Sequence, residues 1–193
     1  MAATKSFRQL LNIPPSTATP NTSVLVIIDA QNEYASGALT VTDAETSRKV
    51  IADLLEKYRK VNGKIIHVLH KTPDGAPIFT PGTELAEEFK ELEPQAGETT
   101  IWKQFPGSFE QTPLHSTLES WGIKKVVLVG YMAHVCVSTT AREAMQKGYD
   151  VVLVEDGIGD RNIPGVSGEE VTRVALAELA DVFGTVVNSS EIK

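Results

Sequence analysis

The feature that most constrains the fold is an alternation of short apolar runs with longer amphipathic segments. Residues 23–30, SVLVIIDA, form a continuous apolar run rich in β-branched side chains. Such a run is too short for a buried helix and is typical of a strand covered on both faces. A segment with apolar side chains at helical spacing follows it and ends near Gly63. Because the same order then repeats, we expect parallel strands joined by helical crossovers.

The repeated pattern divides the whole chain into expected elements. Further strands are expected over residues 64–70, 98–103, 124–130, 149–156 and 185–189, and helices over residues 42–63, 112–122, 136–148 and 167–184. The sequence therefore predicts an α/β fold in three layers (α/β/α), with a doubly wound, mainly parallel six-stranded sheet of the Rossmann-like kind. We expect one domain over residues 1–193, in which residues 1–20 form an N-terminal helix and a linker rich in Pro, Ser and Thr.

Composition excludes several classes of partner. The net charge of −7 argues against nucleic acid, because phosphate binding needs clustered Lys and Arg. No run approaches the ~20 apolar residues that a membrane-spanning helix needs, so no membrane partner is expected. The single cysteine cannot form an internal disulfide. We therefore expect a cytoplasmic protein, although export by an unconventional route would leave no mark in the sequence.

Three polar residues stand where expected strands end. In parallel α/β sheets the ligand crevice lies beyond the carboxyl ends of the strands. Asp29 ends the first strand, Lys103 ends the third, and Cys136 follows the fourth. Each alone has an ordinary explanation as a turn residue, a surface lysine or a small buried hydrophobe. Because the three strands share one sheet, we expect these side chains to converge on one crevice, where His70 and Asp156 also end strands.

The chemistry of these three residues is that of an activated thiol. Cys136 is expected to open the helix over residues 136–148, where the positive end of the helix dipole would lower the pKa of its thiol. Asp29, on an apolar base, could serve as a general base. The charge of Lys103 would favour both anions. The pattern predicts a nucleophilic thiolate.

The remaining histidines and glycines give weaker signals. His67 and His70 lie on opposite faces of one expected strand, so they cannot chelate a metal together. His134, beside the cysteine, is either an alternative base or simply a hydrogen-bonded or exposed histidine. The stretch GIGDRN, residues 157–162, lacks the helix that a dinucleotide loop requires. We therefore expect no metal and no cofactor.

Three motifs together resemble one family. VIIDAQNEY, IWKQFPGSF and GYMAHVCVSTTAREAMQKGYDVVLVED are similar in kind and order to those of the isochorismatase-like cysteine hydrolases, from about Val24 to the last strand. The resemblance implies that Asp29, Lys103 and Cys136 form a catalytic triad. It also implies a cis peptide bond between Tyr131 and Met132, with the backbone N–H groups of Met132 and Cys136 forming an oxyanion hole.

The resemblance has two departures. The lysine motif often ends in Ser-Ala-Phe in the family, whereas here it ends in Gly107-Ser108-Phe109, so the mouth of the pocket is expected to differ. The nicotinamidase branch carries an aspartate with nearby histidines as metal ligands, and no matching cluster is found here. That puts nicotinamide hydrolysis and a bound metal in doubt. The family also implies homo-oligomers, dimers or tetramers, and we expect substrate-binding side chains among Gln31, His70, Phe79, Phe109 and His134.

The leading functional hypothesis is hydrolysis of an amide-type C–N bond in a small molecule, through a thioester on Cys136. One alternative is hydrolysis of isochorismate to 2,3-dihydroxy-2,3-dihydrobenzoate and pyruvate, which needs an acid but no thiol nucleophile. A second alternative is a non-catalytic binding protein on the same fold. The filled triad positions disfavour the last of these.

Overall fold

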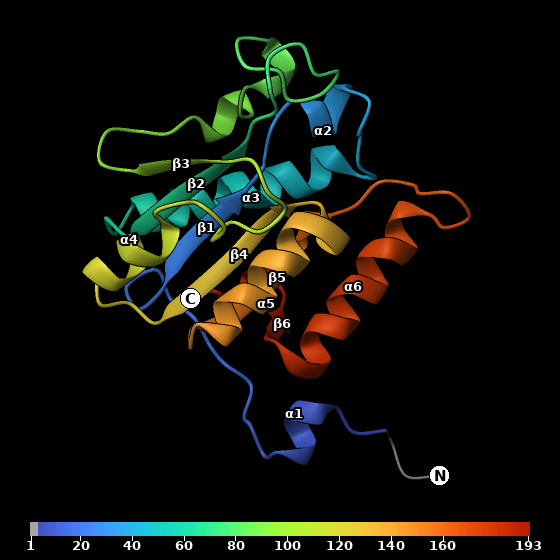
Figure 1. Ribbon diagram of the computed structural model, residues 1–193. Helices are drawn as coiled ribbons and strands as arrows, with labels where there is room; N and C mark the ends of the chain where they lie inside the picture. The colour runs from blue at the N-terminus through green and yellow to red at the C-terminus, as the bar shows by residue number, and fades with distance from the viewer. Residues whose placement is uncertain (1–3) are drawn as a thin grey trace.

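A computed structural model describes residues 4–193 of the chain, and its centre is one parallel sheet of six strands (Figure 1). The strands run in the order β3-β2-β1-β4-β5-β6, and every neighbouring pair is parallel. This confirms the predicted fold class. The strands are β1 (Val24–Ile28), β2 (Lys64–His70), β3 (Thr99–Lys103), β4 (Lys125–Tyr131), β5 (Asp150–Gly159) and β6 (Thr185–Val187).

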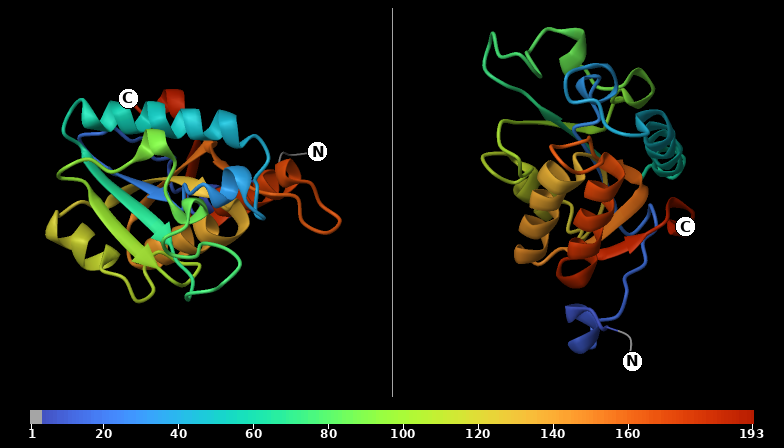
Figure 2. Two further views of the ribbon diagram at one scale, coloured as in Figure 1. Left: turned by 90° about the horizontal axis from the view of Figure 1, so that it is seen from above. Right: turned by 90° about the vertical axis from the view of Figure 1, so that its right-hand side faces the viewer.

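Helices cover both faces of the sheet, which explains why the central strands are apolar on both sides. All five residues of β1 are buried. Figure 2 shows helices lying against both faces of the sheet. One face is covered by α3 (Ala44–Arg59), and the other by α4 (Leu114–Ser120), α5 (Ser138–Gln146) and α6 (Gly168–Val182).

The strand order places a topological switch point between β1 and β4, which are neighbours at the centre of the sheet. Chain segments leave these two strands toward opposite faces: β1 continues to α3, and β4 continues to α5. In doubly wound sheets the crevice beyond the carboxyl ends opens at this point. Asp29 follows β1 and Cys136 follows β4, so the fold sets them on either side of the crevice.

The remaining elements are short. The N-terminal helix α1 (Phe7–Leu10) lies apart from the sheet in Figure 1, and the backbone N–H of Phe7 donates to Asp181 Oδ1 on α6 at 2.7 Å. Residues 1–3 of the expected N-terminal segment lie outside the described residues. The others are α2 (Glu33–Ser36), the 3₁₀ turns η1 (Glu84–Ala86), η2 (Lys90–Leu92) and η4 (Ser189–Glu191), and the π-helical turn η3 (Ala133–Val137).

Two expected element boundaries are wrong, and both affect the site. β5 continues past residue 156 to Gly159, because its register against β4 shifts between Leu128 and Gly130 and extra residues of β5 are taken up there. Asp156 is therefore not at a strand end. Its carboxylate instead accepts hydrogen bonds from the backbone N–H and the hydroxyl of Ser189, at 2.8 and 2.5 Å.

The second wrong boundary concerns the helix after β4. The α-helix α5 begins at Ser138, and Cys136 lies in the π-helical turn η3 that precedes it. The cysteine is thus inside a wider turn rather than at the first position of an α-helix.

Candidate active site

Asp29, Lys103 and Cys136 meet at the carboxyl end of the sheet. Lys103 Nζ lies 2.7 Å from Asp29 Oδ2 and donates a hydrogen bond to Cys136 Sγ at 3.4 Å. All three residues are buried, with exposed fractions of 0%, 1% and 5% respectively. Three side chains that are distant in sequence therefore form one compact cluster, with the ammonium in contact with both other groups.

The backbone at the ends of β1 and β4 is shaped to bring these groups together. Asp29 has a φ of 51°, in the left-handed region, so the chain turns sharply as it leaves β1. Gly130 has a φ of 113°, and a Cβ at this position would collide with the carbonyl group of Ile28. Glycine therefore permits the close approach of β4 to β1. A cis peptide bond between Tyr131 and Met132 follows directly.

Burial sets the protonation state of the cysteine. Burial raises the pKa of the Cys136 thiol to about 12, the negative charge of Asp29 adds to the rise, and the Lys103 ammonium opposes it. The expected lowering of this pKa by a helix terminus is wrong, because loss of hydration and the neighbouring carboxylate outweigh the lysine, and Cys136 lies in the π-helical turn before α5. The resting side chain is a thiol.

This protonation state predicts the reactivity of the thiol. Alkylation of native Cys136 by iodoacetamide should rise about tenfold per pH unit between pH 7 and pH 9 without levelling, because the thiolate is the reactive form. The same cysteine in the urea-unfolded chain should level near an ordinary thiol pKa of about 8.5. The single cysteine makes mass spectrometry of the whole protein a direct measurement. A plateau below pH 9 in the native protein would contradict the buried-thiol assignment.

Lys103 also fixes the state of His70, which ends β2. Its Nζ lies 3.0 Å from His70 Nδ1 and donates to the carbonyl oxygen of Phe105 at 3.1 Å. Burial lowers the pKa of Lys103, but the attraction of Asp29 and Cys136 outweighs burial and the net pKa is raised. Burial and the adjacent ammonium lower the pKa of His70. His70 is thus a neutral ring that accepts through Nδ1 and carries its proton on Nε2.

Aromatic side chains pack beside the cluster of Asp29, Lys103 and Cys136. The Phe79 ring is buried and packs against His70 and Tyr34, with ring centroids 5.2 and 5.3 Å apart. Phe79 has a φ of 49° and is a buried residue within the otherwise mostly exposed segment 71–83. Tyr34, on α2, was not among the residues that the sequence singled out. Burial, Cys136 and Asp29 raise its pKa well above the ordinary value. Only its position at the end of the motif VIIDAQNEY, which contains Asp29, hinted at a place in the site.

Two of the expected substrate-binding residues have other structural roles. The Gln31 side chain donates to the carbonyl oxygens of His70 and Ala86, at 2.9 and 2.7 Å, and accepts from the His70 N–H at 2.8 Å. Both of its amide hydrogens are used, so Gln31 braces the backbone around the site. Phe109 stacks on Tyr149 with centroids 5.9 Å apart, and its ring belongs to the core cluster that α4 and α5 cover.

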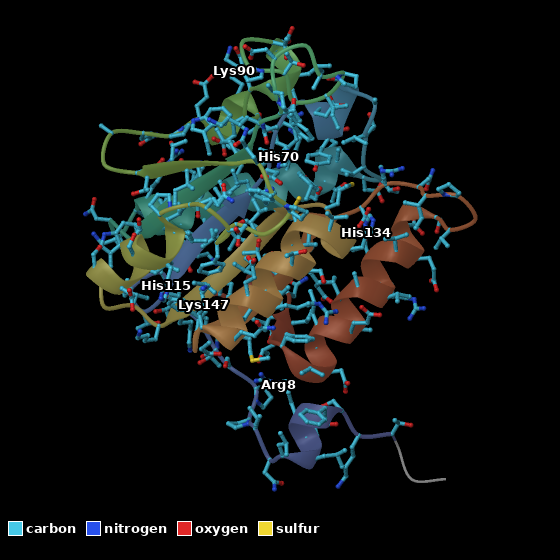
Figure 3. The ribbon with its side chains drawn as sticks, in the orientation of Figure 1. Arg8, His70, Lys90, His115, His134 and Lys147 are labelled. Carbon is cyan, nitrogen blue, oxygen red and sulfur yellow. The ribbon has the colours of Figure 1, made fainter. Side chains whose placement is uncertain are left out.

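His134 lies at the same end of the sheet as His70, whereas His115, which packs against Phe109 and Tyr149, lies toward the opposite end (Figure 3). His134 Nδ1 lies 2.6 Å from Oδ2 of Asp160, and the His134 backbone N–H donates to the same oxygen at 2.9 Å. Asp160 is fully buried and follows the true end of β5. The sequence analysis missed it because it placed the strand end at Asp156. The carboxylate fixes the ring, and Nε2 is left as the accessible nitrogen of a partly exposed histidine.

The chain is similar in sequence and in structure to known proteins. The family model described as the isochorismatase domain matches residues 23–191. A Verticillium dahliae protein named "Secreted isochorismatase effector Isc1" is 59% identical over 97% of this chain and 98% of its own length. A crystal structure of an isochorismatase from Pseudomonas putida KT2440 has a TM-score of 0.95 and 33% identity, and covers 99% of this chain and 100% of that one.

Amidases are among the more distant similar structures. The crystal structure of N-carbamoylsarcosine amidase from Thermoplasma acidophilum has a TM-score of 0.77 and 27% identity, over 89% of this chain and 99% of that one. Within residues 4–193, no helix has the length and apolarity needed to cross a bilayer. No cluster of three or more potential metal-ligating side chains occurs in this part of the chain either.

Proposed function

The chain belongs to the isochorismatase family of hydrolases, and from this premise we propose that it hydrolyses an amide-type C–N bond in a small molecule, with Asp29, Lys103 and Cys136 as its reacting groups. The observation that supports this reaction is the ammonium of Lys103 in contact with both the Asp29 carboxylate and the Cys136 sulfur. A thiol beside a paired carboxylate is the arrangement that nucleophilic catalysis requires.

The proposed reaction begins with the neutral thiol. As the sulfur attacks the carbonyl carbon, the thiol proton passes to Asp29, which lies in the same cluster. The backbone N–H groups of Met132 and Cys136 are proposed to hold the developing oxyanion. One such donor typically contributes about 3 kcal/mol to lowering the barrier.

The second half of the proposed reaction returns the proton. Asp29 protonates the departing nitrogen as the C–N bond breaks, which leaves a thioester on Cys136. Asp29 then takes a proton from the water that attacks the thioester. As the C–S bond breaks, Asp29 passes this proton to the sulfur, which restores the thiol and frees the acid product. Lys103 remains protonated throughout, because its pKa is raised by its two partners. Its ammonium lies 2.7 Å from Asp29 Oδ2 and donates to Cys136 Sγ, so it holds the carboxylate beside the sulfur.

Hydrolysis of isochorismate is the second candidate, and the name of the 59% identical relative favours it. In this reaction an acid protonates the vinyl ether carbon, and water adds to the resulting cation before the C–O bond breaks to release pyruvate. Asp29 is the group placed to supply that proton. The thiol is not required, which separates the two candidates experimentally.

The assay that tests the proposal uses purified wild-type protein with isochorismate beside a panel of small amides, including nicotinamide and an N-carbamoyl amino acid. Release of ammonia or amine from at least one amide is the expected result, and Asp29→Asn should eliminate it. Release of pyruvate from isochorismate, with no amide turned over, would replace the first candidate with the second. Turnover of neither class would leave the binding-protein alternative.

The location of the protein and its oligomeric form are also proposals. The 59% identical relative is named as secreted, so the cytoplasmic location expected from the sequence competes with export of this chain. Comparison of culture fluid with cell lysate by immunoblot decides between the two. A homo-oligomer that takes a small-molecule substrate remains the expected form of the protein.

A further inference from the structure

A groove of about 500 Å³ lies beside β3, the edge strand that carries Lys103. Trp102 forms one side of it and is 45% exposed. Successive side chains of a strand point to opposite faces, so Trp102 points away from the buried side chain of Lys103. Leu69, the register partner of Trp102 on β2, also lines the groove. The groove is therefore separate from the cluster of Asp29, Lys103 and Cys136.

The charged side chains of this groove are all acidic. Three carboxylates line it, from Glu87, Glu88 and Glu93, and no Lys, Arg or His is among the lining residues in the described part of the chain. The Glu88 side chain is only 3% exposed. Its Oε2 is buried and accepts no hydrogen bond from residues 4–193. A buried carboxylate oxygen without a donor is costly, which points to a donor supplied by a ligand.

The other carboxylate oxygen of Glu88 is fixed from beneath. Glu88 Oε1 lies 2.9 Å from His67 Nδ1, and His67 Nε2 lies 3.0 Å from Glu98 Oε2. Arg59 Nε in turn donates to Glu98 Oε1 at 2.7 Å. Because ionised carboxylates only accept hydrogen bonds, the fully buried His67 ring holds Glu88 Oε1 by donating to it. Glu88, which lines the groove, is thus held in one orientation, and its buried Oε2 is the oxygen left without a donor.

We propose that this groove, defined by Leu69, Glu87, Glu88, Glu93 and Trp102, binds an organic cation: an ammonium or guanidinium group on an apolar stem. The positive group is attracted to the face of the exposed indole and to the carboxylates. The apolar stem lies on Leu69 and Ala86. An inorganic cation would leave the indole and these apolar side chains without a contact. The site is independent of the proposed hydrolysis, so its test does not depend on the reaction.

The test uses fluorescence with a single reporter. The chain has two tryptophans, so Trp121→Phe leaves Trp102 as the only one. Pentane-1,5-diamine is titrated into this variant, and pentane-1,5-diol, which has the same length and no charge, is titrated in parallel. We expect a saturable change in Trp102 emission with the diamine and none with the diol. An equal response to both compounds, or no saturable response to the diamine, would overturn the proposal.

A matched pair of double variants tests the carboxylates. Glu87→Gln with Glu93→Gln removes two exposed charges of the groove and should weaken diamine binding about tenfold. Glu84→Gln with Glu110→Gln removes two exposed charges elsewhere and should leave binding unchanged. If both double variants bound the diamine equally weakly, the loss of affinity would be due to net charge alone, and the site would be rejected.

The role of Glu88 has its own readout. Burial raises the pKa of Glu88 above its usual value. A cation binds the ionised carboxylate more tightly, so affinity for the diamine should fall as the pH is lowered through this raised pKa. His67 and Glu98, with Arg59 behind them, are the other charged or titratable groups in contact with this network. In Glu88→Gln the step in affinity should disappear; an unchanged step would assign it to another group and remove Glu88 from the site.

Discussion

Replacement of Lys103 by methionine is expected to lower the free energy of unfolding by about 3–5 kcal/mol and to abolish hydrolysis. The substitution keeps most of the side-chain volume but removes the positive charge that lies 2.7 Å from Asp29. Asp29 is fully buried, so the variant leaves an uncompensated carboxylate in the interior, which is the costly way to break a buried ion pair. Urea unfolding at pH 7, followed by circular dichroism, measures the loss.

Two variants control for this interpretation. Lys125→Met removes a lysine from a partly exposed ion pair with Asp150, at 3.2 Å, and should cost less than about 1 kcal/mol. The double variant Asp29→Asn/Lys103→Met leaves no unpaired charge and should recover a large part of the stability lost in Lys103→Met. A loss in Lys103→Met no larger than that in Lys125→Met would show that the buried pair is not what holds the cluster together.

Replacement of Cys136 by alanine is expected to reduce amide turnover by at least about 10⁴-fold, the scale on which nucleophilic enzymes lose activity when the attacking atom is removed. Neither Asp29 nor Lys103 can replace the sulfur as the atom that forms the thioester. The substitution removes one buried atom from the core cluster that includes Val137 and Ala141, so the loss of stability should be only about 1 kcal/mol. Thermal unfolding of the variant checks that the fold is retained.

Isochorismate supplies the internal control for the same variant. Protonation of its vinyl ether uses an acid and water, so Cys136→Ala should keep most of any pyruvate release that the wild-type protein shows. Loss of both activities in a folded variant would mean that the sulfur also positions the substrate or Asp29. Retention of amide turnover would eliminate the thioester route.

The sequence predicted that Asp29, Lys103 and Cys136 converge because that convergence follows from topology. Asp29, Lys103 and Cys136 each follow or end a strand, and parallel strands bring their carboxyl ends to one edge of the sheet. No knowledge of loops was needed for that step. The alternation of apolar runs and amphipathic segments predicted the sheet in the same way, because each pattern is set by which faces of an element are covered.

The protonation state and the lining of the site depend on contacts that no sequence pattern encodes. The pKa of Cys136 is raised by burial, and that burial comes from side chains of distant segments, among them Phe79 and Tyr34. Phe109 was expected among the substrate-binding side chains, and the packing of its ring on Tyr149 was not readable from the sequence. Asp160 was missed because a shift in strand register lengthened β5, and register is decided between strands rather than within one.

Lys103 is held on β3, a five-residue strand at the margin of the sheet that pairs only with β2. Asp29 and Cys136, by contrast, follow the central strands β1 and β4, which are paired on both sides. Marginal strands fray at lower free energy than central ones. Fraying of β3 withdraws Lys103 while Asp29 and Cys136 keep their places, so mild heating or dilute denaturant should abolish the proposed hydrolysis well before hydrogen exchange reports opening of the central strands.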